Sequence, residues 1–136
     1  EMGYRSPIQP DKESTDRDFD AALTMCFENR DVVATCLGTH NEASSKLLSE
    51  LMAKEGVALD DERFWFAQLY GMSDNISFNL ANAGYNVAKY LPYGPVKAVL
   101  PYLGRRAQEN SSVAGQVGRE MSLIVKELER RKAISN

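Results

Sequence analysis

Apolar residues along the chain alternate between two kinds of stretch, one typical of helices and one typical of buried strands. Asp18–Glu28 has the spacing of a helix, and Ser14, Thr15 and Asp16 precede it as candidate N-caps. The next apolar run, VVATCLG over Val32–Gly38, is continuous and β-rich, which favours a buried strand. The first elements expected are therefore a helix and a strand.

The same alternation recurs twice. Asn41 can cap a second helix that Gly56 ends, and FWFAQLYG over Phe64–Gly71 predicts a second buried strand. The third repeat consists of a helix beginning at Ser73 or Asp74 and stopped by Gly84, and a strand, NVAKYLPYG, over Asn86–Gly94.

Two helices are expected after the third strand. Pro95 stands where a first helical residue belongs, and Pro101 should bend the helix that follows. One side of this helix carries Val96, Val99, Leu100, Leu103 and Ala107, and the other carries Tyr102, Arg105, Arg106 and Glu109. A last amphipathic helix, over about Val113–Ala133, is expected to dock through its apolar face.

Strands that alternate with helices at this spacing predict βαβ units, and hence an α/β fold with about three parallel strands. Such strands need cover on both faces and neighbours at both edges, and 136 residues are too few for a closed barrel of about 250 residues. We therefore expect residues 1–136 to form an incomplete part of a larger α/β domain. The polar start without an initiating Met, EMGYRSPIQPDKES, points the same way.

Charge and composition remove several classes of function. The net charge of −3 and the absence of a basic run argue against nucleic-acid binding. The apolar stretches fall far short of the roughly 20 residues of a membrane helix, and Glu1–Arg5 does not resemble a secretory signal. Cys26 and Cys36 have no Cys or His partner at metal-ligand spacing. We expect a soluble chain with reduced thiols in a cytoplasmic-type compartment and no metal site.

Polar residues gather where each predicted strand ends, in GTHN, LYGMSDN and YLPYGP. Ligands of α/β proteins meet this side of the sheet. His40 is the only histidine, and we expect it to form hydrogen bonds or contact a ligand rather than to transfer protons or bind a metal. Ser44 and Ser45 lack the G-x-S-x-G elbow, and phosphate-binding glycine loops are absent. Any nucleotide must be held in another way.

The arginine pair in YLGRRAQEN is the strongest chemical feature. Adjacent arginines on a helix are usually a solvated face, but this face also carries Tyr102 and Glu109 and follows a loop that brings Tyr90 to a strand end. The two guanidinium groups, of Arg105 and Arg106, can bind a carboxylate or phosphate bidentately. A small anionic substrate is therefore the hypothesis that the residues support.

Four stretches, in order, resemble the proline dehydrogenases, FAD enzymes built on a distorted (βα)8 barrel. SPIQPDKESTDRDF is similar to the loop and helix after the family's fifth strand, and VVATCLGTHN is similar to the sixth strand. FAQLYGMSDNISF resembles the seventh strand, and YLPYGPVKAVLPYLGRRAQEN resembles the last strand and its helix. The resemblance covers nearly the whole chain and implies the C-terminal portion of the barrel.

The resemblance implies substrate-binding roles for five positions. Arg105 and Arg106 match the pair that binds the proline carboxylate, and Tyr90, Tyr102 and Leu69 match residues that pack around the pyrrolidine ring. A bulky phenol at Tyr90 should crowd a 4-hydroxyl group and so favour proline over hydroxyproline.

The resemblance also implies five residues at the FAD. Thr39, His40 and Asn41 match the turn after the sixth strand that contacts the cofactor, and Lys12 matches a lysine in a loop that reaches it. Glu109 matches an acid near the flavin and the arginines.

The reaction implied by the resemblance is hydride transfer from C5 of L-proline to flavin N5, which gives 1-pyrroline-5-carboxylate and passes electrons to a membrane quinone. The parent enzyme would be cytoplasmic or peripheral to a bacterial or mitochondrial inner membrane. The arginines would fix the substrate, the tyrosines would exclude water, and the flavin itself would carry the redox step, so no side chain is assigned as catalytic.

The family's earlier strands, including an RGAY-like segment, have no counterpart here, so we expect the chain alone to retain no stoichiometric FAD and to be inactive without the missing N-terminal part of the barrel. Two alternatives stay open. One is another flavin-dependent barrel, such as the methylenetetrahydrofolate reductase fold, and the other is a non-catalytic fragment that forms homo-oligomers through exposed strand edges.

Overall fold

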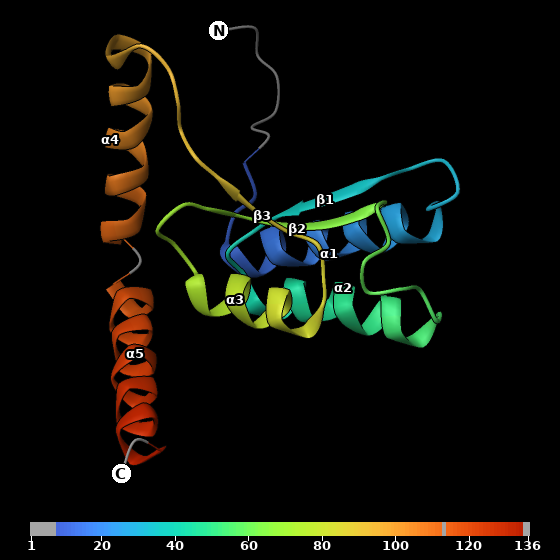
Figure 1. Cartoon of the computed structure of the whole chain (residues 1–136). Coiled ribbons are helices and arrows are strands. Elements are labelled where there is room, and N and C mark those ends of the chain that lie inside the picture. The colour runs from blue at the N-terminus through green and yellow to red at the C-terminus, as the bar shows by residue number, and fades with distance from the viewer. Residues whose placement is uncertain (1–7, 113, 135–136) are drawn as a thin grey trace, which may run out of the picture. The chain divides into compact units, whose positions relative to one another are not determined.

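The structure is a computed structural model that describes residues 8–112 and 114–134. The chain forms two compact units (Figure 1). The first contains Glu1–Gln68 and Ile76–Lys89, and the second contains Leu69–Asn75 and Tyr90–Asn136. We describe each unit by itself.

Helices and strands alternate as the apolar pattern predicts. In the described residues they are α1 (Lys12–Glu28), β1 (Thr35–Gly38), α2 (Glu42–Lys54), β2 (Phe64–Leu69), α3 (Asp74–Ala83), β3 (Val87–Tyr90), α4 (Val96–Ser112) and α5 (Ala114–Ile134). The α/β class and the three strands alternating with helices are confirmed.

The strands form one parallel sheet in the order β1-β2-β3. Thr35 pairs with Phe64 and Gly38 with Ala67. Between β2 and β3, the backbone N–H of Phe66 donates to the carbonyl oxygen of Asn86 at 2.9 Å. Because sequential strands are parallel, each connection must cross back over the sheet, and α2 and α3 make these crossings.

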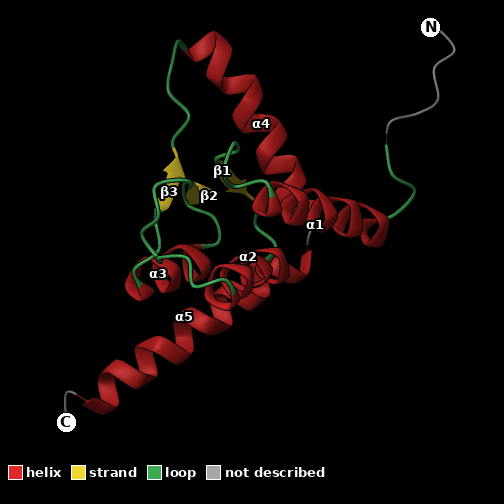
Figure 2. Cartoon of the chain, turned by 90° about the vertical axis from the view of Figure 1, so that its right-hand side faces the viewer, coloured by secondary structure: helices red, strands yellow, loops and turns green. Residues whose placement is uncertain are grey.

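One face of the sheet is covered in the first unit. Figures 1 and 2 show α1, α2 and α3 beside the strands of this unit. Side chains of these helices and of the strands form a single apolar cluster. The buried members of this cluster are Leu23, Phe27, Leu37, Leu48, Met52, Phe64 and Phe66. On the opposite face Trp65 keeps 40% of its surface exposed, and its register partner Cys36 is also exposed. The two-sided cover that parallel strands normally have is therefore present on one side only.

The first helix begins earlier than the sequence analysis predicts. Asp11 is the N-cap, because its Oδ1 accepts from the backbone N–H of Ser14 at 2.7 Å, and the helix starts at Lys12. Ser14, Thr15 and Asp16 lie inside the first turns, so their prediction as caps is wrong. The hydrogen bond lowers the pKa of Asp11, since it favours the charged carboxylate.

The first strand is shorter than predicted. The backbone N–H groups of Val32 and Val33 both donate to the carbonyl oxygen of Asn29 at 3.0 Å. These bonds form the turn that follows α1 and keep both valines out of the sheet, so β1 begins only at Thr35. The β-rich sequence alone could not show that the backbone N–H groups of these valines would form a turn instead of joining the sheet.

The predicted ends of the second and third helices are confirmed. Asn41 caps α2, with Oδ1 accepting from the N–H of Ala43 at 2.9 Å. Gly56 and Gly84 follow α2 and α3 with φ of 64° and 98°, a backbone region that glycine adopts without steric cost. Beyond Gly56, the N–H of Val57 returns to the carbonyl oxygen of Met52 at 2.9 Å, which completes a Schellman motif.

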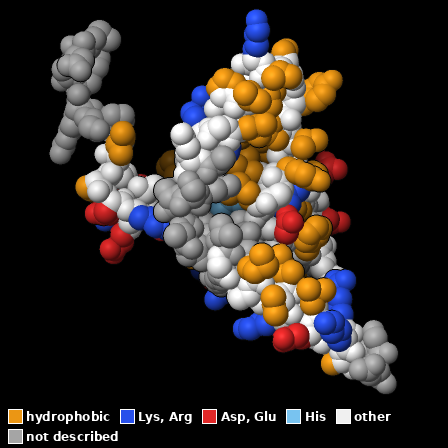
Figure 3. Space-filling view, turned by 90° about the vertical axis from the view of Figure 1, so that its left-hand side faces the viewer, with side chains coloured by type: hydrophobic (Ala, Val, Ile, Leu, Met, Phe, Trp, Pro, Cys, Tyr) orange, Lys and Arg blue, Asp and Glu red, His pale blue; other side chains and the backbone are white. Residues whose placement is uncertain are grey.

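In the second unit, Pro95 precedes α4 rather than opening it. Its carbonyl oxygen accepts from the N–H groups of Ala98 and Val99, and Pro101 lies inside the helix. Apolar side chains of both helices are exposed: Val96, Leu100 and Leu103 on α4 and Met121, Ile124, Val125 and Leu128 on α5. Figure 3 shows one face of the molecule, on which many hydrophobic side chains lie at the surface. Across the described residues, every helix is too short or too polar to cross a membrane.

Candidate functional site

The turn after β1 brings together the three polar residues expected there. Thr39, His40 and Asn41 are all half-buried. The backbone N–H of Asn41 donates to Thr39 Oγ1 at 3.1 Å, and the Asn41 side chain caps α2. The turn is therefore fixed both by its own hydrogen bonds and by the start of the next helix.

Gln68 is a residue that the sequence analysis missed. It is 2% exposed and lies on the same face of β2 as Phe64 and Phe66, where the core begins. Its Nε2 donates to the carbonyl oxygen of Thr39 at 3.3 Å, and its Oε1 accepts from the Ser77 hydroxyl at 2.8 Å. A lone glutamine in phase with two buried phenylalanines was the available signal, because a buried amide must find partners.

Lys12 opens α1 and forms an ion pair with Asp16 one turn later. The helix runs antiparallel to β1, so its first turn lies at the end of the sheet where β1 ends (Figure 1). The structure thus places Lys12 and the Thr39–Asn41 turn at the same end of the sheet in the first unit.

The second unit contains an aromatic and cationic stack. Tyr90, the last residue of β3, and Tyr102 of α4 make an edge-to-face contact with ring centroids 6.0 Å apart. The Arg106 guanidinium carbon lies 5.2 Å from the centroid of the Tyr102 ring. We call these three residues the Tyr–Arg stack. Contacts of this kind hold an aromatic ring and a cation in a preferred mutual orientation.

Three further residues were predicted around this stack: Leu69, Arg105 and Glu109. Leu69 ends β2 and is half-buried, and the adjacent Tyr70 N–H donates to the carbonyl oxygen of Tyr90 at 2.9 Å, so the two strand ends are joined. Arg105 is exposed, whereas Arg106 is half-buried. The side chain of Glu109 lies outside the described part of the structure.

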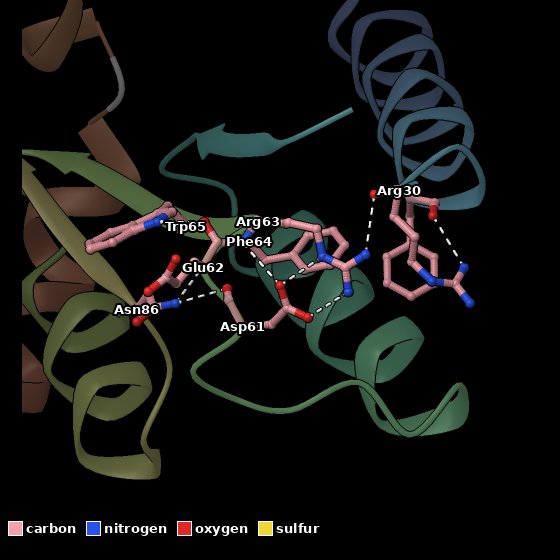
Figure 4. Close-up of polar contacts among 8 residues, drawn as sticks. Arg30, Asp61, Glu62, Arg63, Phe64, Trp65 and Asn86 are labelled. Atoms are coloured by element: carbon pink, nitrogen blue, oxygen red, sulfur yellow. Dashed lines mark hydrogen bonds and ion pairs between the residues drawn. The ribbon is translucent and has the colours of Figure 1, made fainter. Parts of the chain in front are cut away.

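The amino ends of the strands carry a polar cluster of a different kind (Figure 4). Arg63 makes a two-pronged ion pair with Asp61, at 2.6 Å and 2.9 Å, and also donates to the carbonyl oxygen of Arg30 at 3.3 Å. Hydrogen bonds from Arg63 hold the pKa of Asp61 at about 2. Asn86 donates to the carbonyl oxygens of Asp61 and Phe64. These hydrogen bonds all join the side chains to neighbouring protein groups, which is typical of a structural cluster.

No group of three or more His, Cys, Asp or Glu side chains that could hold a metal occurs in the described residues. In the first unit, the turn after β1 carries hydroxyl, imidazole and amide groups; in the second unit, the Tyr–Arg stack carries phenol and guanidinium groups. Such groups bind and orient an anion or a polar cofactor by hydrogen bonds.

A family model described as proline dehydrogenase matches residues 1–119. The chain belongs to the proline dehydrogenase family. The match includes the Thr39–Asn41 turn and the Tyr–Arg stack, whereas most of α5 lies beyond it.

Individual proline dehydrogenases match almost the whole chain. Mitochondrial proline dehydrogenase 1 of Caenorhabditis elegans is 40% identical over 96% of this chain, and that of Homo sapiens is 42% identical over all of it. A hydroxyproline dehydrogenase of Xenopus laevis is also 42% identical, over 96% of the chain. The chain spans 22%, 23% and 29% of the lengths of these three relatives. Equal identity to enzymes named for two imino acids means that identity alone does not select the substrate.

Proposed function

We propose that this chain is the part of a proline dehydrogenase catalytic domain that binds the substrate carboxylate and contributes to the FAD site. In the complete barrel the reaction is the oxidation of L-proline to 1-pyrroline-5-carboxylate. The observation that carries the proposal is the Tyr–Arg stack, which presents a guanidinium at the carboxyl end of a parallel strand, where ligands of such folds bind.

The stack is suited to a carboxylate. The Arg106 guanidinium lies over the Tyr102 ring, and a guanidinium binds a carboxylate through the N–H groups in its own plane. Arg105, the next residue, supplies a second positive group from an exposed position. Tyr90 and Leu69 then form the wall against the pyrrolidine ring, and together these residues fix C5 of proline for reaction.

The first unit fits part of a polar cofactor. Thr39 Oγ1 and Asn41 Oδ1 hold the turn itself, and His40 lies between them in the half-buried turn at the end of β1. When bound, FAD accepts the hydride and later passes electrons to a quinone. We assign Thr39, His40, Asn41 and Lys12 to hydrogen bonds with the cofactor, and Glu109 to the region between the flavin and the arginines.

The remaining part of the barrel is the partner that this assignment requires. It would pair with the edges of β1 and β3 and cover the sheet face that exposes Trp65 and Cys36. We propose that the assembled enzyme is either cytoplasmic or peripheral to an inner membrane, where the quinone is reached.

A graft tests the proposal. The matching segment of the full-length Caenorhabditis elegans relative is replaced by this chain, and the purified chimera is assayed for flavin absorbance and for proline-dependent reduction of a soluble quinone. We expect a yellow protein that oxidises proline. A folded chimera that contains flavin but leaves proline unreacted would count against the substrate assignment.

The exposed sheet face and strand edges favour a second candidate, a non-catalytic fragment that assembles with copies of itself. The mass of the isolated chain in solution distinguishes the two candidates. Self-assembly predicts a flavin-free oligomer, whereas the proline dehydrogenase proposal does not require an oligomer.

A further inference from the structure

Gln68 is a buried amide in a position where an apolar side chain would suit the core. Phe64 and Phe66, four and two residues earlier on the same strand face, are both 1% exposed and belong to the apolar cluster. Burying an amide is unfavourable unless its donor and acceptor are both hydrogen-bonded. A role other than core packing is therefore indicated for this side chain.

The two ends of the Gln68 amide bind two different elements. The Nε2 donor contacts the carbonyl oxygen of Thr39 at 3.3 Å, and the Oε1 acceptor receives the Ser77 hydroxyl of α3 at 2.8 Å. Ser77 is itself 2% exposed, so this bond is shielded from water. Gln68 thus connects the turn after β1 to the helix after β2.

The contacted carbonyl lies in the peptide that joins Thr39 to His40, because the carbonyl of one residue and the N–H of the next form one planar unit. A hydrogen bond to this oxygen limits rotation of the whole peptide plane. The next residue, Asn41, is fixed from the other side by its N–H bond to Thr39 Oγ1 and by its cap on α2. His40 is left between two anchored positions.

We infer that Gln68 is a positioning residue that sets the orientation of the His40 peptide and, through it, the cofactor-binding turn Thr39–Asn41. The inference rests on the proposed function only for the identity of the cofactor. The effect on His40 itself is a property of the isolated chain.

The isolated chain supplies a direct measurement, since His40 is its only histidine. The ring C–H signals of His40 are recorded by NMR in the full chain and in Gln68→Met, which keeps the length of the side chain but removes donor and acceptor. We expect the His40 signals to move or to split into more than one set. Ser77→Ala, which removes the bond to Gln68 Oε1 and keeps the Gln68 donor, should move them in the same direction by less and serves if Gln68→Met does not fold.

Asn86→Leu is the matched control. Asn86 is also an amide of the first unit and donates to two carbonyl oxygens, but at the amino ends of the strands. It should lower the Tm and leave the His40 signals in place. Unchanged His40 signals in both Gln68→Met and Ser77→Ala, with only a lower Tm, would overturn the inference.

The chimera provides the second readout. In the chimera, Gln68→Met removes a hydrogen bond that orients the turn. It should weaken FAD binding by about tenfold, while the KM for proline changes by less than about twofold. An equal change in the FAD affinity and in the KM for proline would indicate a general structural role and contradict the inference. A wild-type chimera that binds FAD but does not oxidise proline would instead contradict the proposed function and leave the Gln68 comparison measurable.

Discussion

At the scale of single residues, Tyr102 and Arg106 define the site. They are four positions apart on α4, so their side chains lie on the same side of the helix, and the tyrosine ring contacts the guanidinium. The sequence predicted this shared side from helical phase alone. It could not predict that Tyr90 would complete the stack, because that contact depends on where β3 ends relative to α4.

Tyr102→Leu should weaken proline binding by removing the ring that orients Arg106. A contact of this kind contributes about 1 kcal/mol, so we expect kcat/KM for proline in the chimera to fall about fivefold, mainly through KM. Tyr102→Phe keeps the ring and should stay within about twofold of the parent. Equal losses in the two variants would show that the hydroxyl rather than the ring matters.

Tyr90 controls the choice between proline and hydroxyproline in this account. It is 54% exposed in this chain and closes the end of β3, where a substrate ring would meet it. We expect the chimera to favour proline, and Tyr90→Ser to narrow the ratio of the two kcat/KM values by relieving the crowding. Tyr93→Ser, in the same loop, is the control and should leave the ratio alone. Equal efficiency of the parent chimera on both imino acids would contradict this role.

At the scale of elements, local hydrogen bonds decide where the predicted helices and strands begin. Asn41 and Gly56 were recognisable from sequence because their side-chain and backbone properties suit only the ends of a helix. Asp11 was missed because it stands in a polar stretch with several equivalent cap candidates. Gln68 was missed because the sequence of a strand does not reveal which loop its buried amide will contact.

The ion pair of Asp61 and Arg63 lies in the loop before β2 and should make stability depend on pH. Arg63 also donates to the carbonyl oxygen of Arg30, which follows α1. The folded pKa of Asp61 is about 2, below its ordinary value of 3.8. Its contribution is therefore present above about pH 4 and is lost as the pH falls toward 2. We expect the Tm difference between the chain and Asp61→Asn to shrink over this interval.

The exposed neighbour Asp60 provides a control, and Asp60→Asn should show no such convergence with the parent. Comparing variants at each pH is necessary because Glu127 of α5, which is hydrogen-bonded to Arg130 and Arg131, also has its pKa lowered to about 2. A Tm difference for Asp61→Asn that stays constant from pH 6 to pH 2 would refute the assignment.

At the scale of the whole molecule, the alternation of elements was predictable and the extent of cover was not. Periodicity identified three strands and the helices that separate them, because each element carries its own apolar pattern. Which apolar side chains stay exposed depends on which elements pack against one another, and the periodicity of the sequence does not show that. Trp65 of β2 and Leu128 of α5 are both exposed. Under the proposed function, these apolar surfaces would pack against the rest of the barrel.

The isolated chain should therefore bind FAD poorly and fail to oxidise proline. Under the proposed assignment it would contribute one turn and a few side chains to a cofactor that, in the resemblance, is also held by earlier strands. We expect the purified chain, incubated with excess FAD and desalted, to retain far less than one equivalent by absorbance. Retention of one equivalent would contradict the division of the site proposed here.

The central claim is that Arg105 and Arg106 bind the carboxylate of the substrate, and a comparison of two substrates tests it most directly. In the chimera, Arg106→Ala should lower kcat/KM for L-proline roughly a hundredfold, which corresponds to a loss of about 3 kcal/mol of transition-state stabilisation. Arg105→Ala should also lower this kcat/KM. Lys97→Ala, which removes a charge from the same helix away from the stack, is the control. With L-prolinamide, which lacks the carboxylate, neither arginine variant should differ from the parent by more than about twofold. The same hundredfold loss for proline and prolinamide would contradict the claim.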